Sequence, residues 1–237
     1  MEWFARDFDH PLYFEIYRSK EEEAFLEGPG LAALLSLPSG SLVLDLPSGW
    51  GRLRPWLERR GHRVVGGDLS RLNLRRQHQE FPGPSVCLDL RALPFRDGCA
   101  DGVLCAYTSW GYFATEEENL RQLQEYARIL RPGGVLLLDL AGRRVVERNV
   151  AEAPKGWYRA REGYRERVRW SPDGRRILAE RLLEGEHFRH DIWLPEDAEV
   201  REALDAAGFA LDAAYGGLNG SPWEDQAERW IYRAVRR

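Results

Sequence analysis

The sequence predicts an α/β protein with a doubly wound, mostly parallel seven-stranded sheet whose last strand is antiparallel. Apolar runs alternate with segments of helical periodicity from about residue 42 to residue 140, which is typical of a parallel sheet covered on both faces. The first run ends in a loop with Gly49 and Gly51, after which helical spacing resumes. The last two predicted strands, residues 209–215 and 229–235, have no helix between them, so we expect them to pair antiparallel.

Length and composition favour a single domain over residues 1–237, with an N-terminal helical segment over residues 1–38. No apolar run reaches the ~18 residues that a membrane span needs, and the acidic start is unlike a secretory signal. The three cysteines include no CxxC pair, and the five histidines show no metal-ligand spacing. We therefore expect a cytoplasmic protein in a reducing compartment, with no membrane contact and no metal site.

Two short helices are predicted before the sheet. Ser19 and Glu22 form a capping-box pattern that begins a helix over residues 20–27, and residues 31–37 have the pattern of a second one. The five parallel strands are expected at residues 42–46, 63–68, 86–89, 102–107 and 135–139. Thr115 and Glu118 form another capping box, which begins a helix that ends before Pro132.

The pattern changes after residue 155. Residues 157–161 and 164–170 alternate with period two, the SPDG sequence that follows predicts a turn, and residues 177–183 and 188–194 could be further strands. These features predict an antiparallel β insert over residues 155–194. Because ligands bind beyond the carboxyl ends of strands in open α/β sheets, we expect this insert to cap the substrate side of the cleft.

The loop DLPSGWG, residues 45–51, carries the most information about the ligand. Its glycines would let the backbone approach a nucleoside closely, but the third glycine of the dinucleotide fingerprint is replaced by Arg54. Asp45 would repel the pyrophosphate of a dinucleotide, whereas it would favour the ammonium group of S-adenosylmethionine (SAM). The loop therefore favours SAM over NAD.

Together these segments resemble the class I SAM-dependent methyltransferases, which have a Rossmann-like fold. The family's loop is typically DLGCGTG, so Pro47 and Trp50 are departures, and the segment LRPGGVL at residues 130–136 resembles the family's turn before strand five. The resemblance implies that Asp68 binds the ribose hydroxyls and Asp89 the adenine amine. The implied cofactor contacts are Asp45, Pro47, Ser48, Gly49, Gly51, Asp68, Leu69, Asp89, Leu90 and Tyr107.

Substrate should lie beyond strand four, where the segment YTSWGYF at residues 107–113 resembles one in some small-molecule methyltransferases. We expect Trp110, Tyr112, His187 and His190 to contact it. Asp139, at the tip of strand five, could contact substrate or pair with Arg143. Methyl transfer depends mainly on positioning, so no catalytic residue is predicted.

Several functions are compatible with these observations. The first is methyl transfer to a small molecule, because the net charge of −4 is unlike that of a nucleic-acid binder. The alternatives are an NAD-dependent oxidoreductase on a related fold and a catalytically inactive SAM-binding domain, the latter because Pro47 and Trp50 could stiffen or crowd the loop. Arginines 159, 161, 165, 167 and 169 share one parity, so they could form an anion-binding face if they point into the cleft.

Overall fold

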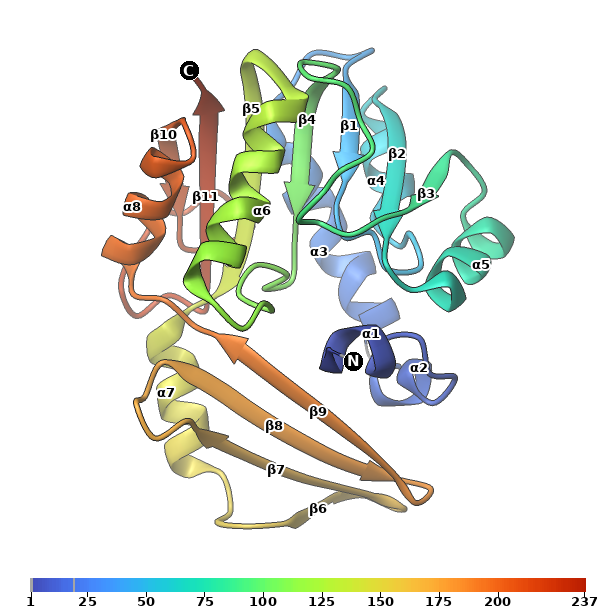
Figure 1. The fold of residues 1–237 in the computed structure, drawn as a ribbon, viewed down its shortest axis with the longest axis vertical. Coiled ribbons are helices and arrows are strands. Elements are labelled where there is room, and N and C mark those ends of the chain that lie inside the picture. Colours follow the sequence, from blue (N-terminus) through green and yellow to red (C-terminus); the bar gives the residue numbers. More distant parts are fainter. Residues whose placement is uncertain (1, 19) are drawn as a thin grey trace.

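The largest sheet of the protein, called the main sheet, occupies the upper part of the view in Figure 1. The computed structural model describes residues 2–18 and 20–237. The seven strands of this sheet are β1 (Leu42–Asp45), β2 (Arg63–Asp68), β3 (Ser85–Cys87), β4 (Ala100–Cys105), β5 (Leu130–Ala141), β10 (Phe209–Tyr215) and β11 (Arg229–Arg236). Their order is β10-β11-β5-β4-β1-β2-β3, and only β11 runs antiparallel to its neighbours. The predicted fold class is therefore confirmed.

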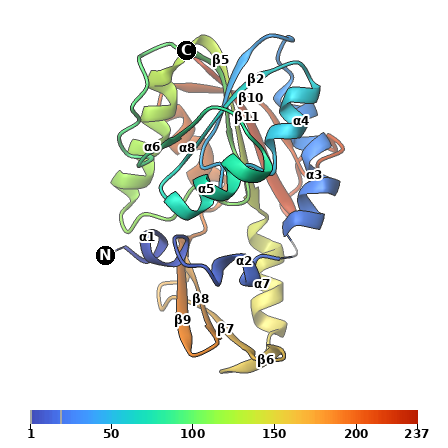
Figure 2. The ribbon, with the colours of Figure 1, turned by 90° about the vertical axis from the view of Figure 1, so that its right-hand side faces the viewer.

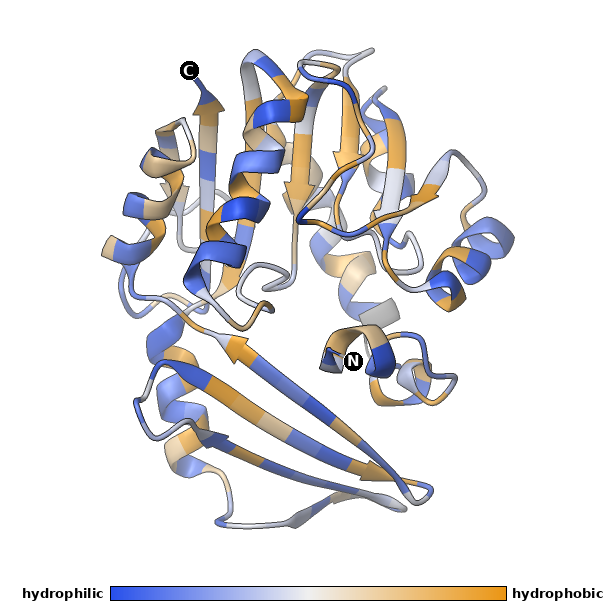
Figure 3. Ribbon diagram, viewed as in Figure 1, coloured by the Kyte–Doolittle hydropathy of each residue, from blue (hydrophilic) through white to orange (hydrophobic). Residues whose placement is uncertain are grey.

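Helices cover both faces of the main sheet (Figure 2). The helices of the described residues are α1 (Trp3–Asp7), α2 (Tyr13–Ile16), α3 (Lys20–Leu35), α4 (Arg54–Arg59), α5 (Arg71–Glu80), α6 (Glu116–Ile129), α7 (Arg143–Glu152) and α8 (Asp197–Ala206). One apolar cluster packs α6 and α8 against the sheet, and a second packs α3 and α4 against the opposite face. The strands between these layers are mostly hydrophobic, whereas α6 and α8 are amphipathic (Figure 3).

Helix α3 corrects the prediction of two short helices. It runs unbroken for 16 residues with Pro29 inside it, while Ser19, the predicted cap, lies outside the described residues. Gly28 and Gly30 let neighbouring elements approach, since a Cβ on Gly28 would lie 2.1 Å from a ring atom of Trp56 in α4. Close packing of this helix therefore outweighs the local tendency of the Gly-Pro-Gly sequence to end it. The predicted capping of α6 is confirmed, because Thr115 Oγ1 accepts a hydrogen bond from the Glu118 amide.

A separate antiparallel sheet lies beside the carboxyl ends of the parallel strands, with α1 and α2 between the two sheets (Figures 1 and 2). Its strands, in spatial order, are β6 (Tyr158–Arg161), β7 (Tyr164–Trp170), β8 (Arg176–Leu183) and β9 (Glu186–Trp193). Helix α7 connects β5 to this sheet. The second sheet lies within the predicted range of the insert, residues 155–194.

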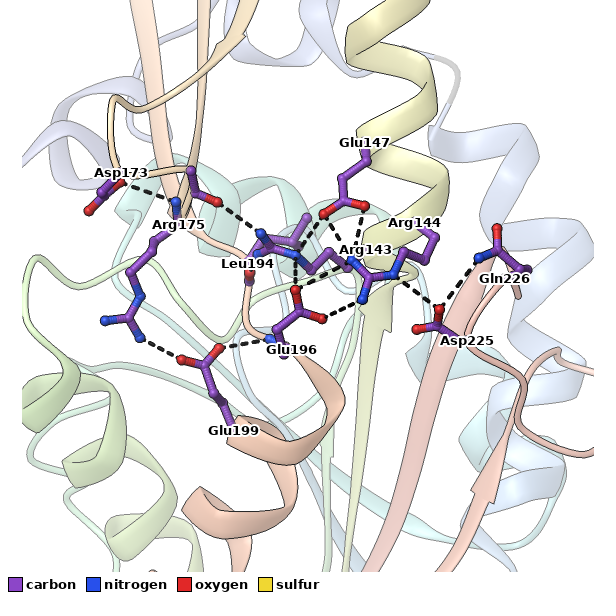
Figure 4. Close-up of polar contacts among 11 residues, drawn as sticks. Arg143, Arg144, Glu147, Asp173, Arg175, Leu194, Glu196, Glu199, Asp225 and Gln226 are labelled. Carbon is purple, nitrogen blue, oxygen red and sulfur yellow. Dashed lines mark hydrogen bonds and ion pairs between the residues drawn. The ribbon is translucent and has the colours of Figure 1, made fainter.

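The junction between the two sheets is fixed by charged side chains (Figure 4). Arg143, at the start of α7, pairs with Glu196 at 2.9 Å and donates hydrogen bonds to the carbonyl oxygens of Leu194 and Gly174. Arg144 pairs with the same Glu196 at 3.0 Å. The chain passes from the main sheet into the insert just before Arg143 and returns just after Leu194. One network therefore holds both crossings and fixes the orientation of the insert.

Candidate functional site

A cavity of about 300 Å³ lies between the carboxyl ends of the parallel strands, the N-terminal helices and the insert. Of the residues that the sequence predicted for the site, those that line it are Pro47, Ser48, Gly49, Asp68, Leu69, Asp89, Leu90, Tyr107, Tyr112 and His190. Asp45, Gly51, Trp110 and His187 do not line it. The cavity therefore brings together residues that are up to 143 positions apart in the sequence.

The glycine loop forms one wall of the cavity. Gly49 has a φ of +54°, and a Cβ at this position would meet no atom within 4 Å, so its free side is open space. The Ser48 amide is bonded to the Gly67 carbonyl at 2.8 Å, which holds the loop against β2. Gly51, with a φ of +80°, has a different role, because a Cβ there would lie 2.5 Å from Gln77. Gly49 thus leaves room for a ligand, and Gly51 permits close internal packing.

Trp50 does not crowd this loop. Its side chain is 1% exposed, does not line the cavity and packs edge-on against Phe14 with ring centroids 5.6 Å apart. It therefore supports the segment that carries α2 and leaves the ligand side of the loop free.

Asp45 is buried beneath the loop instead of facing the cavity. Its side chain is 2% exposed, and burial raises its pKa to about 7, although Arg52 and Arg54 act in the opposite direction. The sequence analysis expected Asp45 to contact the cofactor, and the structure corrects this expectation. The carboxyl lies where it can act on a ligand only through its electrostatic field and not by direct contact.

Asp68, at the end of β2, does face the cavity. Its Oδ2 accepts a hydrogen bond of 2.8 Å from the Gly49 amide, and its Oδ1 accepts one of 2.8 Å from the Ser70 amide. Ser70, and not Asp68, caps α5 by accepting from the Asn73 amide. A carboxylate has about four lone-pair positions, so Asp68 retains acceptor capacity for ribose hydroxyls.

Asp89 lines the cavity next to Leu90 and is held by Arg91. Partial burial opposes its ionisation, but hydrogen bonds from the Arg91 side chain, the shortest of 2.7 Å, outweigh that effect and lower its pKa. Arg91 also pairs with Glu2 and Glu118, at 2.8 and 2.7 Å. Asp89 is thus an oriented, ionised acceptor at the end of the cavity that the resemblance assigns to adenine.

The turn after β4 is strained and is held by Asp139. Tyr107 and Thr108 both have positive φ angles, of 59° and 58°, which residues other than glycine rarely adopt. The Tyr107 amide donates to Asp139 Oδ2 at 2.8 Å, and Thr108 Oγ1 accepts from the Ala141 amide at 2.8 Å. Asp139 itself pairs with Arg229, whereas the sequence had left open a contact with substrate or a pair with Arg143. It therefore positions the turn and the cavity residue Tyr107.

The N-terminal helices supply a wall that the sequence did not predict. Phe4, Phe8, Tyr13 and Tyr17 line the cavity. Asp9 accepts hydrogen bonds of 2.8 Å from the Ser70 hydroxyl and the Leu72 amide, while Asp7 accepts one of 2.5 Å from the Arg189 amide. Residues 2–18 thus form a strap that is bonded to the start of α5 and to β9 and covers the cavity.

The insert contributes His190 and Ile192 to the cavity. The prediction that His187 also contacts substrate is wrong. His187 lies three positions before His190, so the alternation of side chains along a strand places it on the other face of β9. There it is half-exposed and 3.5 Å from Glu180. Arg167 also pairs with Glu180, and Arg165 and Arg169 are exposed. This arginine face therefore points away from the cavity.

Trp110 is a core residue and is the other correction among the predicted substrate contacts. Its side chain is fully buried and packs on Trp193 with ring centroids 5.1 Å apart, and its indole nitrogen donates to the Asn119 carbonyl at 2.8 Å. These contacts of Trp110 hold in place the turn that presents Tyr112 to the cavity.

Arg52 is a cavity residue that the sequence analysis missed, although its position directly after Gly51 was a usable signal. Its guanidinium lies over the rings of Trp50 and Tyr107, at 4.6 and 4.3 Å from their centroids. Its Nε is buried without a hydrogen-bond partner. A cation with an unsatisfied buried donor beside an open glycine loop fits the carboxylate of an amino-acid-like ligand.

Two structural features bear on other kinds of site. Within residues 2–18 and 20–237, no group of three or more His, Cys, Asp or Glu side chains is arranged to hold a metal ion. Over the same residues, no helix is both long and apolar enough to cross a bilayer.

The strand order is that of a Rossmann-like fold, and acidic residues end two of its neighbouring strands beside the cavity. Residues 44–138 match the family model described as "Methyltransferase domain". The matched part of the chain is thus similar to a methyltransferase domain, in agreement with the resemblance. In structure it is similar to a SAM-dependent methyltransferase from Clostridium acetobutylicum ATCC 824, with a TM-score of 0.73, 16% identity, and 94% of this chain and 96% of that one covered. SAM is the cofactor of this class.

Two curated relatives match part of the sequence. YqeM of Bacillus subtilis (strain 168), provisionally described as a methyltransferase, is 32% identical over 109 residues, which are 44% of this chain and 44% of YqeM. The tRNA (carboxymethyluridine(34)-5-O)-methyltransferase ALKBH8 of Mus musculus is 32% identical over 130 residues, which are 54% of this chain and 19% of ALKBH8. The match therefore spans less than half the length of either relative.

Proposed function

We propose that this protein transfers the methyl group of SAM to a small-molecule acceptor. The observation that carries the proposal is the continuity of one cavity, which runs from the acceptors Asp68 and Asp89 to the aromatic wall formed by the strap and the insert. Its volume of about 300 Å³ and the strap across it suit a small acceptor better than a macromolecule.

The residues present fit the cofactor. Asp68 would accept from the ribose hydroxyls and Asp89 from the adenine amine, while the open side of Gly49 would admit the ligand and Arg52 would pair with its carboxylate. When bound, SAM supplies a methyl group on a sulfonium, which is electrophile and leaving group in one. The chain's own task is to orient the acceptor and exclude water, and the strap supplies both.

Calorimetry with S-adenosylhomocysteine (SAH) and with NAD tests the proposal against the oxidoreductase alternative. We expect SAH to bind and NAD not to bind, because Asp45 disfavours a pyrophosphate at the loop. Binding of NAD without SAH would reject the proposal. The inactive-domain alternative predicts that SAH binds but that no acceptor is methylated by SAM. The side chain of Trp50 counts against this alternative, because it packs away from the cavity against Phe14.

A tRNA acceptor is the second candidate, favoured by the relationship to ALKBH8, whose description names tRNA. The net charge of −4 counts against it, because phosphate-backbone binding requires a positive surface. Salt-sensitive binding of tRNA, with methyl transfer to it, would establish the second candidate and reject the first.

A further inference from the structure

Helix α1 is held at both of its ends by carboxylates of the strap. Glu2 lies directly before this helix, and Asp9 lies two residues after its end. Between these two acids, Phe4 and Phe8 line the cavity. The helix therefore carries part of the cavity wall, and the contacts of the two acids hold that part in place.

Ser70 connects the second of these acids to Asp68. The Ser70 amide donates to Asp68 Oδ1 at 2.8 Å, and the Ser70 hydroxyl donates to Asp9 Oδ1 at 2.8 Å. The Leu72 amide donates to the same oxygen of Asp9, also at 2.8 Å. Ser70 is buried, so water has little access to these bonds. A single residue thus joins one carboxylate of the cavity to one anchor of α1.

Arg91 makes the second connection, and all five of its N–H donors are engaged with carboxylates. Nε and Nη2 donate to the two oxygens of Asp89 at 3.0 and 2.7 Å, while Nη1 and Nη2 donate to the two oxygens of Glu2 at 2.8 and 2.9 Å. The other hydrogen of Nη1 is donated to Glu118 at 2.7 Å. Because the guanidinium is planar and rigid, its two bidentate pairs fix Asp89 and Glu2 relative to each other.

Asp68 and Asp89 have equivalent places in these two connections. Each lines the cavity, and each lies two residues before the residue that holds α1. In the proposed function each also accepts from the adenosine half of the cofactor. A ligand donor restricts the orientation of the carboxylate that it binds, and Ser70 and Arg91 depend on this orientation. Cofactor binding and docking of α1 therefore favour each other.

Helix α1 depends on contacts with the rest of the protein. It has only 5 residues, and a helix this short is not stable by itself in water. The Phe8 amide closes its last turn by donating to the Phe4 carbonyl at 3.1 Å. Exchange of the Phe8 amide hydrogen with solvent therefore reports whether the helix is docked.

We propose that Ser70 and Arg91 are positioning residues that couple α1 to the cofactor, so that the adenosine half of the cofactor closes the strap over the cavity. The inference rests on the proposed binding of SAM at Asp68 and Asp89. It specifies which half of the cofactor controls the aromatic wall. The amino-acid half would lie at Arg52, which takes part in neither connection.

Hydrogen exchange of the Phe8 amide, followed by NMR on the full chain, tests this coupling with three probes: SAH, adenosine and methionine. We expect saturating SAH or adenosine to slow the exchange at least about fivefold, which is within the usual range of coupling between two sites. Methionine at the same concentration should not slow it, because it has neither the ribose nor the adenine.

A double variant, Glu2→Ala with Asp9→Ala, removes both anchors and leaves the cofactor carboxylates intact. SAH should still bind, more weakly by about the factor by which it slows exchange in the wild type, because coupling is reciprocal. It should no longer slow the exchange in this variant. Glu117→Ala with Glu202→Ala removes the same charge at exposed positions of α6 and α8, and this control should behave as the wild type.

Arg91→Lys separates the shape of the guanidinium from its charge. A lysine keeps the positive charge but cannot form two bidentate pairs. With SAH at saturation, this variant should lose most of the slowing of Phe8 exchange. Full slowing would show that charge alone suffices, and it would overturn the positioning role of Arg91.

The other outcomes are equally decisive. An unchanged exchange rate with SAH bound, slowing by methionine, or slowing that persists in the double variant would overturn the coupling while leaving methyl transfer in place. Adenosine that fails to bind where SAH binds, or that binds without slowing the exchange, would overturn the role of the adenosine half. Failure of SAH to bind would instead reject the proposed function.

Discussion

The backbone amide of Gly49 donates a hydrogen bond of 2.8 Å to the carboxylate of Asp68. This bond joins the glycine loop after β1 to the end of β2, two elements 19 residues apart in the sequence. Asp68 faces the cavity as well, so one carboxylate fixes the shape of the loop and presents acceptor oxygens to a ligand.

Replacement of Asp68 by alanine should therefore weaken SAH binding by at least about tenfold. The variant loses charge-assisted hydrogen bonds to the ribose, each worth about 1.5–3 kcal/mol, and releases the Gly49 amide. Calorimetry measures the loss. Asp97→Ala, at a side chain that is 77% exposed, is the control and should bind SAH normally. An unchanged affinity in Asp68→Ala would refute the ribose assignment.

Gly49→Val should abolish SAH binding in a protein that still folds. The branched side chain would occupy the open space beside the loop and would be strained at a φ of +54°. Gly174→Val, at a φ of +69° in a turn of the insert, carries similar strain away from the cavity and should still bind SAH. If both variants lose binding equally, strain and not occupancy of the ligand space explains the result.

Asp45 should make stability depend on pH. Its pKa of about 7 in the folded state is above its unfolded value, so the folded protein keeps a proton that the unfolded chain releases. The contribution of Asp45 to the free energy of unfolding is thus fully present below about pH 4 and is lost as the pH rises to about 7, at most about 4 kcal/mol in total.

Asp45→Asn should lack this component, so its stability should rise relative to wild type between pH 4.5 and 8 in urea unfolding experiments. The remaining carboxylates titrate in both proteins and cancel in the difference. Parallel pH profiles for the two proteins would show that Asp45 has an ordinary pKa.

Arg229→Met should destabilise the protein by about 3–5 kcal/mol, because it leaves the fully buried carboxylate of Asp139 without its partner. The strained turn at Tyr107 should loosen as a result, and SAH affinity should fall with stability. The matched change Arg233→Met breaks a pair with the exposed Asp212 and should cost less than about 1 kcal/mol. Similar unfolding free energies for the two variants would contradict the assigned role of Asp139.

Most of the sheet was predictable from sequence because its parallel strands contain apolar runs bounded by turn signals. The carboxylates that follow these strands were predictable for the same reason, since the carboxyl ends of parallel strands meet at one edge. The sequence alone also predicts that His187 and His190 lie on opposite faces of their strand, because residues three positions apart on a strand face opposite sides.

Other parts of the site depend on tertiary packing and had no local signal. Phe8 and Tyr17 directly follow the short helices α1 and α2, which no strong periodicity marks, and only their contacts with β9 and the loop after β4 reveal their role. Trp110 and Tyr112 are two positions apart in one aromatic segment, and their different environments follow from the position of α6.

The strap has a consequence for the order of folding. Asp7 and Asp9 are two residues apart, yet their partners are 182 residues and about 60 residues further along the chain. Contacts of such long sequence separation form late, because both partners must already be ordered before the closure entropy is recovered. During synthesis the strap, which precedes β9 in the chain, must therefore wait for β9 before it can close the cavity. The ligand site is then complete only in a chain whose two sheets have both formed, so a partly synthesised or partly unfolded chain has an open nucleotide cleft without its acceptor wall.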